Sequence, residues 1–122
     1  MKVKIDTKEK FHVITPEEPV LSANMTEEFK QMLLAYQEKE PRNIVLNLAQ
    51  VKEIDSLGAQ TILLLQQTFY EKKASFVVCE MGKEVEDLFE RSGSLDLLNF
   101  TSTESEAWDI VQMEEIEREF LD

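Results

Sequence analysis

Carboxylates are so numerous in this chain, with 25 Asp and Glu residues, that their presence carries little information, and few other residues could supply catalytic or metal-binding chemistry. Its 122 residues include one histidine, His12, and one cysteine, Cys79. A zinc site needs a larger set of such ligands, so these two residues cannot complete one. Ser56 has no histidine partner in a recognisable triad motif, and the three isolated glycines form no phosphate-binding loop. We therefore expect a protein that is not an enzyme and that holds no metal or cofactor.

The composition narrows the class of partner. The chain carries 25 acids against 13 Lys and Arg residues, for a formal net charge of −12. This balance argues against nucleic acid and against an anionic membrane surface, both of which attract clusters of Lys and Arg. No apolar run approaches the ~20 residues of a membrane span, and the first residues form no signal-peptide core. We expect a cytoplasmic protein without membrane insertion that favours basic partner surfaces.

The most informative segment joins an apolar strand to an apolar helix. Residues 44–48 are nearly continuous in apolar side chains, which is typical of a central strand covered on both faces. Asp55 and Ser56 follow a short turn and stand directly before a helix expected over residues 57–72. Either side chain could cap the free backbone N–H groups of that helix. Capping alone would explain both residue types.

Short elements surround this segment. Alternating residues predict strands over 2–6 and 11–14, followed by a loop between Pro16 and Pro19. Asn24 or Thr26 could cap the next helix, with Glu27 and Glu28 in its first turn. Further along, the pattern predicts a strand over 75–80 with a buried Cys79, a helix over 83–91 and a very short strand near residue 100.

The last helix is expected to begin near Thr103, with Glu106 three residues later completing a capping box. Its inward side chains are expected to be Ala107, Trp108, Val111, Met113 and Ile116. Residues 104–122 hold eight acids and one base, Arg118, and so contribute −7 to the net charge. This charge is typical of a solvated helix face and frayed tail, and an acidic docking tail is the alternative.

The order of these elements predicts the fold class. Strands alternate with helices along residues 1–122, without an internal repeat or a long linker. We expect a single α/β domain with a four- to five-stranded mixed sheet, flanked by about four helices and joined by right-handed crossovers.

The same ordered motifs resemble the STAS family, which is named for sulfate transporters and anti-sigma factor antagonists. The matching residues are the strand at 44–48, then Ile54-Asp55-Ser56-Leu57-Gly58 and the apolar helix from Ala59. The strand at 76–78 and the helix ending at Gly93 follow in the family's order, up to Ala107. The resemblance covers almost the whole chain and implies the STAS-type, SpoIIAA-like fold.

The resemblance also implies a function. It indicates a bacterial, non-catalytic module similar to an anti-sigma factor antagonist (an anti-anti-sigma factor), which regulates transcription through a partner switch kinase or anti-sigma factor. In the phosphorylated antagonists, the serine after the Asp accepts the phosphate, and that serine corresponds to Ser56. A phosphate would add about −1.5 to −2 charge beside Glu53 and Asp55.

Two alternatives stay open at this point. Ser56 could be only a helix cap. The chain could also be a STAS subunit of a lipid-transport ATPase complex, which docks on the ATPase without phosphorylation. The identity of the partner and the oligomeric state do not follow from the sequence.

A candidate partner surface follows from helical spacing. Residues four, seven and eleven positions after Gln60 share one side of the expected helix. The polar residues Gln60, Gln67 and Glu71 mark this side as the outer one, and Leu64 among them is expected to be an exposed apolar residue. Together with the turn, the candidate partner-binding residues are Asp55, Ser56, Gln60, Leu64, Gln67 and Glu71.

Overall fold

A strand buried on both faces lies at the centre of the fold. The computed structural model describes residues 1–121, and among them β4 (Asn43–Asn47) is the third strand of a five-stranded sheet of order β1-β2-β4-β6-β7. It pairs in parallel with β2 (Phe11–Pro16) and with β6 (Phe76–Cys79). β1 (Val3–Thr7) is antiparallel to β2, and β7 (Phe100–Thr101) is parallel to β6. The predicted mixed sheet and its central apolar strand are therefore confirmed.

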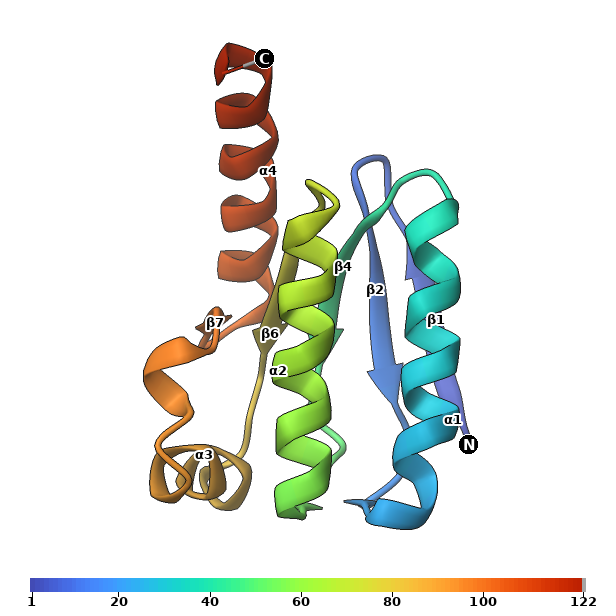
Figure 1. Ribbon diagram of the computed structural model, residues 1–122, viewed down its shortest axis with the longest axis vertical. Helices are drawn as coiled ribbons and strands as arrows, with labels where there is room; N and C mark the ends of the chain where they lie inside the picture. Colours follow the sequence, from blue (N-terminus) through green and yellow to red (C-terminus); the bar gives the residue numbers. More distant parts are fainter. Residues whose placement is uncertain (122) are drawn as a thin grey trace.

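Helices cover both faces of this sheet (Figure 1). α1 (Ala23–Leu34) and α2 (Ser56–Glu71) lie side by side on one face, and α3 (Lys83–Arg91) packs against the same hydrophobic cluster. α4 (Glu104–Leu121) packs on the opposite face. Two 3-10 turns, η1 (Ala35–Glu38) and η2 (Leu95–Leu97), complete the connections.

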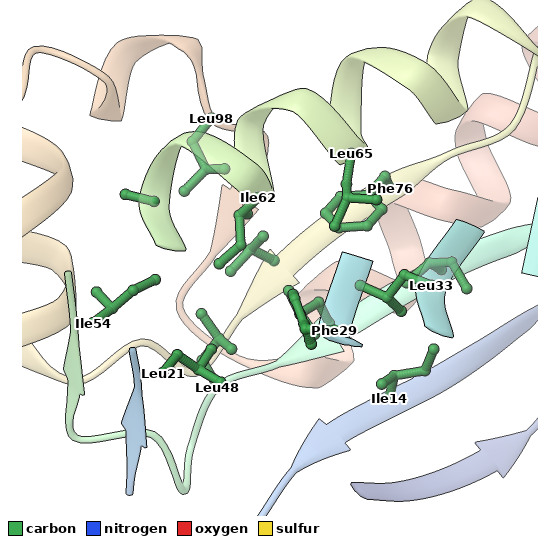
Figure 2. Packing of buried hydrophobic residues seen from close by; sticks show 14 of the residues in the cluster. Ile14, Leu21, Phe29, Leu33, Leu48, Ile54, Ile62, Leu65, Phe76 and Leu98 are labelled. Atoms are coloured by element: carbon green, nitrogen blue, oxygen red, sulfur yellow. The ribbon is translucent and has the colours of Figure 1, made fainter. Parts of the chain in front are cut away.

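The alternation of side chains along each strand explains why central residues are apolar at every position. In β4, Ile44 and Leu46 point into the larger cluster under α1 and α2, part of which is drawn in Figure 2. Val45 points the other way, into a smaller cluster with Ala107 and Val111 of α4. Both faces of β4 are therefore closed to water, and each face requires its own helix layer.

A second, very short sheet was not expected from the sequence. β3 (Val20–Leu21) pairs in parallel with β5 (Glu53–Ile54), in segments that the sequence indicates only as a loop and a turn. Two-residue strands are too short to show a periodic pattern, which is why sequence reasoning missed them.

The start of α1 differs from the prediction. Its N-cap residue is Ser22, so neither Asn24 nor Thr26 is the cap. Thr26 lies within the helix, where its hydroxyl donates to the Ser22 carbonyl at 3.0 Å. With the helix starting at residue 23, Glu27 and Glu28 fall after its first turn.

The start of α4 agrees with the prediction, but its inward face does not. Thr103 and Glu106 form the expected capping box, with the Glu106 carboxylate accepting from the Thr103 N–H at 3.1 Å. Met113 and Ile116, however, are 59% and 53% exposed, so the prediction that they pack inward is wrong. The inner face is formed by residues at helical spacing, namely Ala107, Val111, Glu114 and Arg118.

Cys79 is fully buried at the end of β6, as expected. Burial, together with the charges of Glu104 and Glu80, raises the pKa of its thiol to about 12. Because the thiolate is the reactive form, native Cys79 is protected both by protonation and by lack of access. Since the chain has no other cysteine, any thiol signal reports on β6.

We expect Cys79 to react with an aromatic disulfide reagent at pH 8 only when the protein unfolds. The labelling rate should be very low in buffer and should rise with urea in parallel with unfolding followed by circular dichroism. Rapid labelling without denaturant would contradict the burial of β6. Leu46→Ala should speed labelling, because removing a buried leucine side chain costs about 2–5 kcal/mol. Leu97→Ala, at a position 68% exposed, is the matched control and should leave the rate unchanged.

Candidate functional site

Asp55 and Ser56, either of which could be the helix cap by sequence, have different positions in the turn before α2. Asp55 is the N-cap residue in extended conformation, and its Oδ1 accepts from the Gly58 N–H at 2.8 Å. Ser56 is the first residue of α2, and its side chain is exposed. The predicted position of Ser56 therefore agrees with the structure, and Asp55 is the cap. The role of Ser56 as a phosphate acceptor stays a prediction.

Gly58 allows the first turn of α2 to lie close to β5. A Cβ atom added at this position would be 2.7 Å from Cγ1 of Ile54 and 3.3 Å from Oδ1 of Asp55. The first of these distances is too short for a real contact, and Ile54 is buried in the main cluster. Glycine at this position therefore preserves both the packing of Ile54 and the cap.

Backbone hydrogen bonds anchor the turn to the segment after β2. The N–H groups of Lys52 and Glu53 donate to the Pro19 carbonyl at 2.8 and 3.0 Å. The Asp55 N–H lies 3.4 Å from the Leu21 carbonyl, next to the β3–β5 pairing. Main-chain atoms thus position Ser56 at the carboxyl end of the parallel strands, the edge at which α/β proteins commonly bind ligands.

The outer face of α2 lies beside this turn. Gln60, Leu64, Gln67 and Glu71 are all exposed, so the structure brings the predicted stripe onto one accessible helix face. Leu57, which sequence reasoning did not select, is 47% exposed and extends the stripe to the residue after Ser56. Its spacing of seven residues from Leu64 is the signal that could have identified it.

Between α1 and α2 the surface forms a groove of about 310 Å³. Leu57 and Leu64 line it from α2, and Lys30 and Glu27 line it from α1. The groove therefore combines apolar contact area with charges of both signs.

The other side of the turn is acidic. A second hollow, of about 400 Å³, is lined by Glu53 and by Glu84 and Asp87 of α3, with Arg91 at the same surface. Leu57, the residue after Ser56, lines the α1–α2 groove, and Glu53, three residues before Ser56, lines this acidic hollow. Additional negative charge on the Ser56 hydroxyl would strengthen an existing negative potential.

The remaining candidate groups lie elsewhere. His12 is 4% exposed, and its Nδ1 lies 2.8 Å from the Thr7 hydroxyl, with Tyr36 against its ring. Burial lowers its pKa, although the Pro41 backbone acts in the opposite direction. Within residues 1–121, no cluster of three His, Cys, Asp or Glu side chains is arranged to hold a metal ion. None of the helices described there is both long and apolar enough to cross a membrane.

Comparison with known families identifies the fold. The model of the STAS domain family matches residues 2–107, and the chain belongs to this family. A relative from Bordetella bronchiseptica, BtrV, is named as an anti-sigma factor antagonist. It is 33% identical over 78 residues, which cover 64% of this chain and 66% of that protein, just under two thirds of its length.

Solved structures agree on the fold. A Thermotoga maritima protein described as an anti-sigma factor antagonist superposes with a TM-score of 0.82 at 19% identity, covering 90% of this chain and 94% of that one. The Bacillus cell fate determinant SpoIIAA in its phosphorylated form gives a TM-score of 0.65 at 18% identity, covering 90% and 99%. The predicted STAS-type, SpoIIAA-like fold is therefore confirmed.

The cap gives a test of the local structure. We expect Asp55→Ala to lower the free energy of unfolding by about 0.5–2 kcal/mol, because the Gly58 N–H loses its acceptor. Asp55→Asn is the matched control and should retain most of the stability, since its side-chain oxygen can accept the same bond. The measurement is urea unfolding followed by circular dichroism. Equal losses in the two variants would contradict capping as the contribution of Asp55.

Proposed function

We propose that this protein is a non-catalytic regulatory module of the anti-sigma factor antagonist type, controlled by phosphorylation of Ser56. Its partner is a serine kinase-like anti-sigma factor, and it acts in the bacterial cytoplasm to regulate transcription. Residues 1–122 act as a single domain. The observation that carries the proposal is the exposed Ser56 at the first turn of α2, where Asp55 already fills the capping role.

The surroundings of Ser56 support a phosphate acceptor. An exposed serine at a helix start is accessible to a kinase, and the first-turn N–H groups and helix dipole favour an anion there. The chain also belongs to a family in which a relative is named as an anti-sigma factor antagonist and in which a phosphorylated form of one member is known. These observations support Ser56 as the phosphate acceptor of the folded protein.

The switch acts through charge. A phosphate adds about −1.5 to −2 charge beside Glu53 and Asp55, where the surface is already acidic. A partner that covers the unmodified turn would have to bury this charge or lie against it with its own acids. Both cost binding free energy, so phosphorylation releases the partner.

The partner surface combines the turn with the outer face of α2. Asp55 and Ser56 lie at one end of this surface, and Gln60, Leu64, Gln67 and Glu71 continue it along the helix. Leu57 and Leu64 supply apolar contact at the α1–α2 groove. A partner docked there would contact Ser56 directly, which couples binding to the phosphate.

The charge change can be tested with substitutions. The partner would first be isolated by pull-down from the native cell, with mass spectrometry of Ser56, and affinities would then be measured by calorimetry at two salt concentrations. We expect Ser56→Asp to weaken binding by about tenfold, or ~1.4 kcal/mol, and less at high salt. Ser56→Ala should bind like the wild type but escape regulation by the kinase.

The matched control is Ser105→Asp, which adds the same charge at an exposed serine in the first turn of α4. It should leave affinity unchanged. Equal affinities of the wild type, Ser56→Asp and the phosphorylated protein would reject the switch. If the pull-down captures a transporter ATPase, and the wild type, Ser56→Asp and the phosphorylated protein bind it equally, the alternative of a transport-complex subunit is favoured.

The helix face has its own test. We expect Gln60→Arg/Gln67→Arg to weaken partner binding by about tenfold, because two bulky cations would stand in the interface. Gln112→Arg, at an exposed position on α4, is the control and should bind normally. Normal binding by the double variant would reject this face of α2 as the partner surface. The phosphorylation of Ser56 would still be decided by the serine variants.

A further inference from the structure

The outer side of α4 carries an apolar stripe that the fold does not use. Met113, Ile116 and Phe120 are 59%, 53% and 85% exposed. Their spacing of three and seven residues aligns them on one face, opposite the inner face that carries Ala107 and Val111. The stripe lies wholly beyond residue 107, where the match to the STAS domain model ends. Because its three side chains are exposed, the stripe is not needed to complete the core described above.

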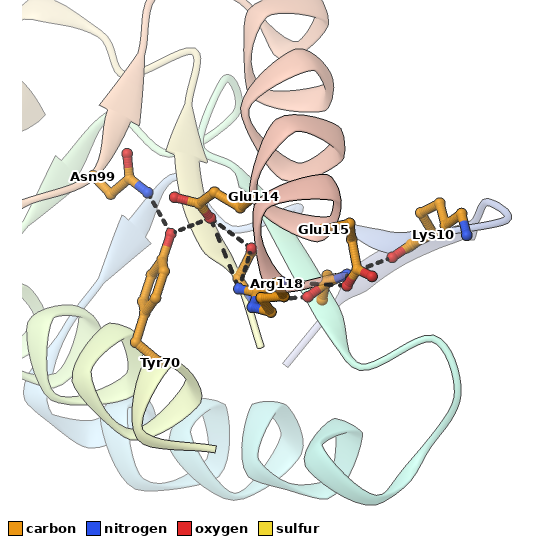
Figure 3. Close-up of polar contacts among 8 residues, drawn as sticks. Lys10, Tyr70, Asn99, Glu114, Glu115 and Arg118 are labelled. Carbon is orange, nitrogen blue, oxygen red and sulfur yellow. Dashed lines mark hydrogen bonds and ion pairs between the residues drawn. The ribbon is translucent and has the colours of Figure 1, made fainter. Parts of the chain in front are cut away.

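A polar network holds this part of α4 against the end of the sheet (Figure 3). Tyr70 of α2 donates to Glu114 at 2.7 Å, and the Ser75 hydroxyl donates to the same oxygen. Arg118 donates to Ser75 at 2.7 Å and to Glu115 at 3.2 Å. These contacts fix the helix on its inner side, so the stripe is presented on a positioned helix rather than on a loose tail.

An apolar hollow continues the stripe on one side. It has a volume of about 390 Å³ and lies between α4 and the β1–β2 hairpin, lined by Phe11, Trp108 and Ile116 among others. Ile116 belongs to both the stripe and the hollow. Lys8 and Lys10 line its hairpin side, and Lys8 is already paired with Asp6 at 3.0 Å. The accessible apolar area is thus wider than the three stripe residues alone.

The charges around the stripe indicate what could cover it. The exposed charged residues beside it on α4 are Asp109, Glu117 and Glu119. The one base of this helix, Arg118, points inward to Ser75 and Glu115. An apolar stripe with an acidic border is complementary to an amphipathic helix with Lys and Arg beside its apolar face.

We propose that the outer face of α4 is a second docking surface, which binds a basic amphipathic helix of another protein. A second copy of this chain is a poor occupant, because residues 104–122 carry a charge of −7 and two such helices would repel each other. Figure 1 shows the C-terminal turns of α4 at the end of the molecule opposite the start of α2. One module could therefore hold this partner while the Ser56 surface stays free, and the proposal is independent of the proposed function.

The probes are two labelled synthetic peptides of equal length that form amphipathic helices with the same repeat of Leu residues. The charged residues are Lys in the first peptide and Glu in the second. We expect the Leu/Lys peptide to bind the full chain in a fluorescence anisotropy titration and the Leu/Glu peptide to fail. Met113→Ser/Ile116→Ser/Phe120→Ser should weaken the Leu/Lys peptide by about tenfold or more, since apolar contact area is lost. This variant keeps every charge, so general attraction between a basic peptide and an acidic protein is unaltered.

The matched control is Leu57→Ser/Leu64→Ser, which removes exposed leucines from the α1–α2 groove and should bind the peptide like the wild type. Unfolding by urea should show that both variants stay folded, because all five side chains are exposed. Equal affinity of the triple variant and the wild type would overturn the proposal, as would a loss confined to the control variant. Wild-type dimers in sedimentation that the triple variant abolishes would also overturn it, in favour of a second copy.

Discussion

The burial of β4 on both faces is the constraint on which the rest of this structure depends. A parallel strand between two parallel neighbours cannot expose either face to water without exposing Ile44 and Leu46 on one side or Val45 on the other. α1 and α2 close the first face and α4 closes the second. The same strand delivers the chain to the carboxyl edge of the sheet, where the turn with Asp55 and Ser56 begins.

Much of this fold could be predicted from the sequence, because the long elements have a strong period. The apolar run of β4 and the helical spacing in α2 indicated their type and place, and the helix over 83–91 agrees in its bounds with α3. The β3–β5 pair has two residues in each strand and no period. The layers of the fold could therefore be predicted from the sequence, but the β3–β5 pair that anchors the candidate site could not.

Single-residue roles were harder to predict, since they depend on geometry rather than on type. Asp55 and Ser56 can both cap a helix, and only the bond from the Gly58 N–H assigns the cap to Asp55. Met113 and Ile116 look like core residues by type. They lie outside because the inner face of α4 continues with Glu114 and Arg118, whose partial burial is made possible by their bonds to Tyr70 and Ser75. Sequence alone does not reveal that a polar network replaces apolar packing.

The anchoring of the Ser56 turn through main-chain atoms has a consequence for how this surface can diversify. The bonds from Lys52 and Glu53 to the Pro19 carbonyl, like the β3–β5 pairing, use backbone groups only. Every residue has the accepting carbonyl, and every residue except proline has the donating N–H. Exposed side chains at Val20, Lys52 and Glu53 can therefore change type without displacing the serine. Related chains could acquire new partner preferences at the border of this site while keeping its position, which separates the evolution of specificity from the maintenance of the fold.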